Sequence, residues 1–451
     1  RKEKIKFTIE DDKGNQVGEP VYLDMIQVRR IENPKGVWRS AGKKDDFHVT
    51  LMRLPKEDET SYVTFKSEGA WRAEIMEGGD DFISLEATSE GSEGIVNTDS
   101  KRIEGASEHL IDFKIKFNGT IKETEVRCAI VRVRYHNYTC EHSIFVRQGY
   151  APITLNGNTE SETNPAWTSF NVYRFDANDT PVYTNSPLEE GSLFRRGNYT
   201  AILASNNERA GFKFGEGPDG NFTVLEKGKT AESELSWEGL QPSLTNNSLV
   251  SGWSIAGNNE RIAKIEDFYT LESTSIHSNI NKGYGVLYGD GATETQSSVD
   301  IAWGYDRGED PKSSVKGMRG CFVYNINNGR NIFLPVGKSG YGRRIGSPDT
   351  KSNPNDKAGR LRYAGRSDYY TKNDPSGNIK YLPLFYDLFE RPGAIYHCRN
   401  RLLKSEIKNV NESSAFDINY FTMGFEGFLN GAADADDGSN CDACFIRTVK
   451  Y

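Results

Sequence analysis

Asn-Gly and Asp-Gly pairs recur throughout the sequence, and they constrain the fold more than any other feature. Both residues of such a pair tolerate positive φ, which tight turns between antiparallel strands require. Seven pairs occur, at Asn118-Gly119, Asn156-Gly157, Asp219-Gly220, Asp290-Gly291, Asn328-Gly329, Asn430-Gly431 and Asp437-Gly438. Long amphipathic helical patterns are missing, and the best helical candidate is the short segment 383–391. We therefore predict a chain built mainly of short β-strands.

Size and charge narrow the class of protein. A chain of 451 residues is too long for one ordinary core, so we expect about three domains. The net charge is −8, with Lys and Arg interleaved among Asp and Glu, which argues against a nucleic-acid partner. No stretch approaches the roughly 20 apolar residues of a bilayer span. The sequence starts at Arg1, so we expect a mature or trimmed form, and six Cys are compatible with an exported protein.

The first region, residues 1–150, predicts a β-sandwich. Its clearest strand candidates are segments 62–75, 82–87, 111–119, 131–135 and 142–150. Phe113, Ile115 and Phe117 alternate with polar residues, as the buried face of a sheet requires. Val131, Val133 and Tyr135 alternate in the same way. Five or more strands at this spacing favour a sandwich of immunoglobulin type.

Segment 47–150 also resembles the BACON module of Bacteroidota. The resemblance lies in Gly69-Ala70-Trp71, the following segment 80–86 (DDFISLE), and the closing segment 146–150 (VRQGY). It implies display at the cell surface, beside domains that act on glycans. Many such modules serve as spacers, so no sugar site is carried over. Trp71 is expected to be a core anchor, because a single Trp before a strand suits a sandwich core.

The second region, residues 151–264, resembles the N-terminal domain of Bacteroidota fimbrillins and their accessory subunits. The resemblance lies in segment 173–179 (YRFDAND) and segment 197–207 (GNYTAILASNN). It implies a transthyretin-like β-sandwich. Trp237 and Trp253 are expected to pack in a core or between domains.

The third region, residues 265–451, resembles the Fibrobacter succinogenes major paralogous domain. Four segments follow in the family's order, at 333–337, 393–396, 417–421 and 445–449. His397, Cys398 and Thr448 depart from the family's pattern. The resemblance implies a mixed α+β, C-type-lectin-like domain. The expected fold is thus mainly β, with two tandem β-sandwiches, immunoglobulin-like and transthyretin-like, followed by this domain.

Chemistry-bearing motifs are weak. Segment 434–442 (DADDGSNCD) has the oxygen ligands that calcium prefers, but its Gly and closing Glu do not match an EF-type loop. The sugar-binding signatures of calcium-dependent lectins are missing, and no G-x-S-x-G nucleophile motif occurs. We therefore expect no catalytic residue, no metal and no cofactor.

The remaining motif is the Cys441-x-x-Cys444 pair near the C-terminus. With Cys398 and either His397 or Cys321 it would complete a zinc site, and one of its cysteines could instead form a disulfide with Cys398 or Cys321. Buried free thiols are a third reading. We expect the disulfide, as a staple at the start of a final strand. For Cys128 and Cys140, a bridge and buried free thiols are equally compatible with the sequence.

Three β-rich domains without an active-site constellation describe a surface protein better than an enzyme. The resemblances imply an accessory or tip subunit of a Bacteroidota fimbria, located at the cell surface and outer membrane. Its partners would be other fimbrial subunits, joined through donated or exchanged edge strands, and a host or bacterial surface protein or glycan. Tyr341, Tyr369 and Tyr370 are the candidate ligand contacts. The alternative is a glycan-binding outer-membrane lipoprotein of a polysaccharide-utilisation system, and a lectin-fold enzyme is a third possibility.

Overall fold

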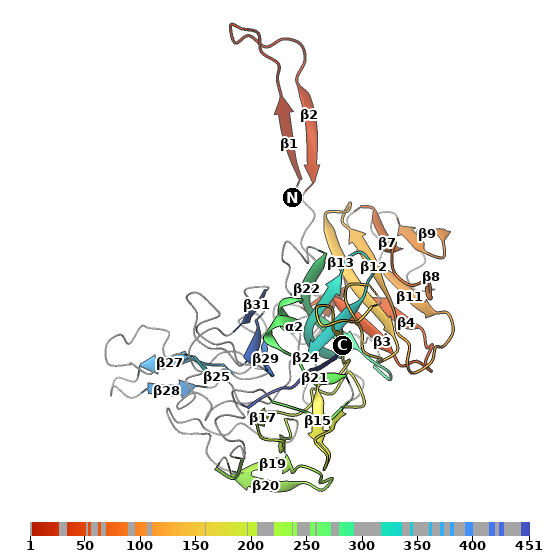
Figure 1. Cartoon of the computed structure of the whole chain (residues 1–451). Coiled ribbons are helices and arrows are strands. Elements are labelled where there is room, and N and C mark those ends of the chain that lie inside the picture. The colour runs from red at the N-terminus through yellow and green to blue at the C-terminus, as the bar shows by residue number, and fades with distance from the viewer. Residues whose placement is uncertain are drawn as a thin grey trace.

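The structure, a computed structural model, describes most of the chain. The described residues exclude 1, 27–33, 51–52, 56–61, 65–68, 89–94, 106–110, 158, 196, 205–220, 237, 241–252, 258, 272–278, 293–316, 336–342, 346–359, 363–369, 374–378, 383–392, 400–414, 420–423 and 428–442. Within this part the fold is mainly β, with 33 strands, one short α-helix and one 3-10 turn (Figure 1). The predicted predominance of strands is confirmed. The predicted helix at 383–391 and Trp237 lie outside the described residues.

The predicted turn pairs have the backbone that they were expected to supply. Four of them lie in the described part, and their glycines at positions 119, 157, 291 and 329 have φ between 70° and 88°. Asn328-Gly329 closes the tight turn between strands β23 and β24. The other three pairs lie outside the described residues.

The largest sheet has nine strands. Its order is β24 (Asn331–Pro335), β23 (Met318–Asn325), β22 (Ile280–Tyr288), β3 (Lys35–Arg39), β13 (Cys140–Gln148), β12 (Arg127–Tyr135), β7 (Trp71–Ile75), β10 (Arg102–Gly105) and β9 (Ile95–Asp99). β3 lies in the middle and runs parallel to both of its neighbours, whereas the other pairs are antiparallel. A fully buried strand such as β3 suits this central place.

A three-stranded sheet packs against the part of the large sheet that runs from β22 to β10. Its order is β4 (Phe47–Thr50), β11 (Asp112–Phe117) and β8 (Ile83–Ala87). Phe113, Ile115 and Phe117 are at most 5% exposed, and they share one core with Trp71 and Val131 of the large sheet. The predicted buried faces of these strands and the core position of Trp71 are confirmed.

Smaller sheets make up the rest. Four of them include strands of the predicted second region: β14 (Ala166–Trp167), β33 (Thr448–Lys450) and β21 (Glu260–Ile262); β15 (Val172–Phe175) and β16 (Pro181–Tyr183); β17 (Phe194–Arg195) and β32 (Ala443–Cys444); and β18 (Ala201–Ile202), β19 (Asn221–Leu225) and β20 (Ser233–Ser236). The others are β5 (Arg53–Pro55) and β6 (Tyr62–Thr64); β25 (Arg343–Ile345) and β26 (Arg360–Arg362); β27 (Tyr370–Asn373) and β28 (Ile379–Leu382); and β29 (Gly393–His397), β30 (Ala415–Asn419) and β31 (Gly424–Gly427). The helices are η1 (Glu238–Leu240) and α2 (Ile265–Tyr269).

Strand pairing crosses both boundaries that the sequence suggested between regions. β22, β23 and β24 belong to the predicted third region, but they extend the sheet of the first region through β3. The C-terminal strand β33 pairs with β14 and β21, which both belong to the predicted second region. The three predicted regions are therefore joined by shared sheets.

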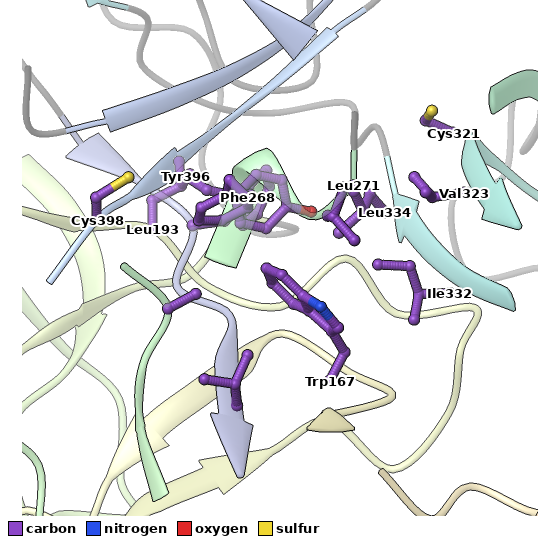
Figure 2. Close-up of a cluster of buried hydrophobic side chains, with 14 of the residues drawn as sticks. Trp167, Leu193, Phe268, Leu271, Cys321, Val323, Ile332, Leu334, Tyr396 and Cys398 are labelled. Atoms are coloured by element: carbon purple, nitrogen blue, oxygen red, sulfur yellow. The ribbon is translucent and has the colours of Figure 1, made fainter. Parts of the chain in front are cut away.

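One hydrophobic core draws on all three regions, and Figure 2 shows members from the second and third. Trp167 stacks edge-on against Phe268 of α2, with ring centroids 5.1 Å apart, and Phe268 lies 6.0 Å from Tyr396 of β29. Leu334 of β24 and Cys128 of β12 belong to the same buried cluster. Trp253 is buried in a neighbouring cluster, as the sequence predicted. Within the described part of the chain, no helix has the length and hydrophobicity that a membrane crossing needs.

Residues 2–26 form a sheet of their own. β1 (Lys2–Phe7) and β2 (Val21–Ile26) pair antiparallel, with Phe7 opposite Val21, and neither strand belongs to another described sheet. Figure 1 shows this hairpin in red, projecting from the remainder of the described chain. The sequence placed these residues within the first β-sandwich. The hairpin lies apart from the sandwich because β1 and β2 pair with each other and with no other described strand.

Candidate functional site

The predicted ligand contacts in the C-terminal region stay predictions. Tyr341 and Tyr369 lie outside the described residues. Tyr370 begins β27, where its backbone pairs with Leu382, and nothing further is described of its side chain. Segment 434–442, the weak calcium candidate, also lies outside the described residues. Among the residues that the structure does describe, no three His, Cys, Asp or Glu side chains gather in a way that could hold a metal ion.

The structure describes the positions of two of the three cysteines near the C-terminus, Cys398 and Cys444. Cys398 is fully buried and directly follows β29, while Cys444 ends β32 and Cys441 lies outside the described residues. Tyr396 and Phe445 form a parallel bridge, which places Cys398 three residues further along its strand than Cys444. That offset corresponds to about 10 Å, more than the Cα separation of a disulfide. The register therefore disfavours a Cys398–Cys444 bridge, and a bridge through Cys441 stays a prediction.

Two other cysteines are buried thiols. Cys128 and Cys321 are unbridged, and both belong to the same buried cluster, in which Figure 2 labels Cys321. In the β12–β13 hairpin, Cys128 pairs with Arg147 at one end and Cys140 with Tyr135 at the other, so Cys128 and Cys140 lie too far apart to bridge. Burial raises the pKa of Cys128, and it raises the pKa of Cys321 to about 12.

We expect Cys128 and Cys321 to be inert in the native protein. Because their raised pKa values keep both thiols protonated at pH 8, alkylation should be more than roughly 100-fold slower than in the unfolded chain. Timed iodoacetamide labelling with peptide mapping, with and without guanidinium chloride, measures this difference. Equal labelling rates in the two conditions would contradict the burial of these side chains.

The hairpin of residues 2–26 carries the most distinctive exposed surface among the described residues. Large apolar side chains cover it, and most of the exposed ones in the described chain belong to it: Ile5 (37% exposed), Phe7 (53%), Ile9 (73%), Val17 (53%), Val21 (66%) and Tyr22 (56%). Soluble proteins seldom expose a contiguous apolar patch unless it serves an interaction. The hairpin is therefore the candidate interaction site.

Alternation along β1 produces an apolar face and a polar face. Ile5 and Phe7 occupy odd positions of β1, and Ile9 continues the alternation beyond its end, whereas Lys6 lies on the other side, opposite Tyr22 of β2. Phe7 lies opposite Val21, and the N–H of Val17 donates to the carbonyl of Ile9 at 2.6 Å, which extends the pairing toward the tip. We call the side formed by Ile5, Phe7, Ile9, Val17 and Val21 the apolar face.

The tip of the hairpin is an ordered turn. The carboxylate of Asp11 accepts hydrogen bonds from the backbone N–H groups of Lys13 at 2.9 Å and Asn15 at 2.8 Å, and from the Asn15 amide. These hydrogen bonds lower the pKa of Asp11, and the two from Asn15 contribute more than the one from Lys13. Gly14 has a φ of 80°, which the turn requires and which glycine adopts without strain. The turn thus fixes the register of the two strands.

Two properties make this hairpin suitable for binding a partner. An isolated two-stranded sheet is at best marginally stable in water, so covering its apolar face stabilises it. Its outer strand edges also present backbone N–H and C=O groups that can pair with another strand. The sequence contains a signal for this hairpin, because apolar and polar residues alternate over residues 4–9. The strands predicted for the first region all lie beyond residue 47.

Comparison with known proteins gives no family. No protein-family model matches the chain, and no curated protein matches it.

Proposed function

We propose that the protein is a non-enzymatic subunit of a bacterial surface fimbria, an accessory or tip component exported to the cell surface. The observation that supports this proposal is the hairpin of residues 2–26, whose apolar face is exposed. A subunit that must join a polymer needs such a surface, whereas a free-standing monomer is destabilised by it. The resemblances in the sequence point to the fimbriae of Bacteroidota.

The body of the protein suits the role of a rigid spacer. The nine-stranded sheet and the core of Figure 2 hold the three sequence regions together, so load on one region is shared by the others. The hairpin would join neighbouring fimbrial subunits. The C-terminal region, with Tyr341, Tyr369 and Tyr370 as candidate contacts, would bind a host or bacterial surface protein or glycan.

The proposal predicts that the hairpin is needed for assembly but not for folding. In the producing bacterium, a variant lacking residues 1–26 should still fold and reach the surface, because β1 and β2 pair with each other and not with another described sheet. Far-ultraviolet circular dichroism of the purified variant should show a folded β-protein that has lost only the contribution of the hairpin. Its amount in sheared fimbriae should fall at least about tenfold relative to the full chain. Quantitative immunoblotting of sheared and residual fractions measures this ratio.

The variant Lys6→Gln is the matched control, since Lys6 lies in the same strand but on the side away from the apolar face. It should assemble normally. Absence of the full-length protein from sheared fimbriae would exclude the fimbrial role and favour the glycan-binding lipoprotein.

A further inference from the structure

The tetrapeptide Lys-Ile-Lys-Phe occurs twice in this chain, at residues 4–7 and at residues 114–117. Both copies lie in β-strands, in β1 and in β11. Ile115 is fully buried and Phe117 is 5% exposed, whereas Ile5 is 37% exposed and Phe7 is 53% exposed. The same side chains, with the same alternation, are covered in one strand and uncovered in the other.

The buried copy shows what kind of surface covers this pattern. Ile115 and Phe117 share a core with Ala73, Val131 and Ile144 of the nine-stranded sheet. That surface is a second β-layer whose inner face combines small and aliphatic side chains with aromatic ones such as Trp71 and Tyr288. Two such layers pack about 10 Å apart with their strands roughly aligned. The uncovered copy thus has the side chains that fit against another β-layer.

The hairpin itself presents such a layer. Its apolar face combines Phe7 with the aliphatic residues Ile5, Ile9, Val17 and Val21. Lys6 lies on the other side, opposite Tyr22, so two apolar faces can meet without bringing its charge into the contact. The apolar face is therefore complementary to a copy of itself.

We propose that the apolar face of the hairpin packs against the same face of a second copy of this chain, forming a two-fold symmetric dimer with a four-stranded, two-layered contact. The proposal rests on the proposed function, in which the hairpin is the assembly element. The extended part of the hairpin, from Lys2 to Glu10, is about 27 Å long, so an antiparallel arrangement places the two bodies at opposite ends and leaves the contact clear.

The size of the surface sets the expected affinity. The five side chains of the apolar face expose roughly 500 Å² per copy, so the dimer buries on the order of 1,000 Å². That area lies at the lower limit of specific interfaces. We therefore expect a reversible dimer with a Kd on the order of 10 µM rather than a permanent one.

Sedimentation-velocity centrifugation of the full chain between 1 and 200 µM tests the proposal. The protein should pass from monomer to dimer over this range. Phe7→Lys should raise the Kd at least about 100-fold, because it places a charge in the centre of the contact. Lys6→Gln, one residue away on the polar face, should leave the Kd within about twofold.

A second measurement guards against unfolding of the hairpin in the variant. Hydrogen exchange of the amides of residues 2–26 in the full chain should slow as the concentration rises through the Kd, and should be independent of concentration in Phe7→Lys. If the full chain stays monomeric at 200 µM, or if Phe7→Lys leaves the dimer unchanged, a second copy does not cover the apolar face.

Either result leaves the fimbrial proposal standing if the hairpin is still needed for the protein to appear in sheared fimbriae. Conversely, if the protein forms the hairpin dimer but is absent from fimbriae, the self-association stands and the fimbrial role is excluded.

Discussion

Replacing Arg147 with Met is expected to lower the free energy of unfolding by about 3–5 kcal/mol, a large share of the stability of an ordinary domain. The guanidinium is fully buried, and it donates to the carbonyls of Gly149 at 3.1 Å, Asn331 at 2.9 Å and Ala151 at 2.7 Å. It also lies over the ring of Trp38, 4.4 Å from its centroid. Met would fill much of the space but remove the guanidinium donor from all three carbonyls, of which only that of Ala151 also accepts from the Ser169 hydroxyl, at 3.2 Å.

The position of Arg147 explains why the effect should reach the whole body. The residue lies in β13 of the first region, Asn331 begins β24 of the third, and Ala151 opens the second. Burial lowers the pKa of Arg147 to about 10, so the side chain remains protonated and keeps all its donors at pH 7. One side chain therefore bonds to the backbone of all three regions.

Urea unfolding followed by both tryptophan fluorescence and circular dichroism measures the change. Arg147→Lys, which keeps the charge but not the planar fork, should fall between wild type and Arg147→Met. Arg132→Met, on the neighbouring strand and paired with Glu74 at 2.6 Å, should cost less than about 1 kcal/mol because that pair is partly exposed. Similar losses for Arg132→Met and Arg147→Met would contradict a special role for Arg147.

Val449→Asp is expected to destabilise the protein by at least about 4 kcal/mol. Val449 is fully buried in the middle of β33, and its backbone pairs with Trp167 on one side and Arg261 on the other. A carboxylate at this position would be buried in the hydrophobic cluster to which Val449, Trp167 and Phe445 belong. Thermal unfolding should therefore show a greatly lowered midpoint, or no folded protein.

Val449→Ala keeps this test informative if the Asp variant does not fold. It should lose about 2 kcal/mol, because it removes two buried methyl groups and leaves a small cavity. Lys450→Gln is the matched control on the next residue of the strand, which is partly exposed, and should change stability by less than about 0.5 kcal/mol. A tolerated Val449→Asp would mean that β33 is not part of the core.

The sequence supplied much of the candidate site's chemistry but not its location. Ile5, Phe7 and Ile9 alternate with polar residues as clearly as Phe113, Ile115 and Phe117 do. Alternation identifies a strand with one apolar face, but it does not say whether another layer covers that face. The structure distinguishes the two copies of Lys-Ile-Lys-Phe because only one has the nine-stranded sheet against it.

Local signals determined the β class, the positive-φ glycines of the turns and the buried faces of β11 and β12, because these depend on residues close together in the chain. The pairing of β3 with β22 and of β14 with β33 joins residues hundreds of positions apart. No local pattern specifies such partners, since many strands with one apolar face could pair equally well. Tertiary structure alone therefore decided that the three sequence regions share sheets and a core, and that the first hairpin stands apart from them.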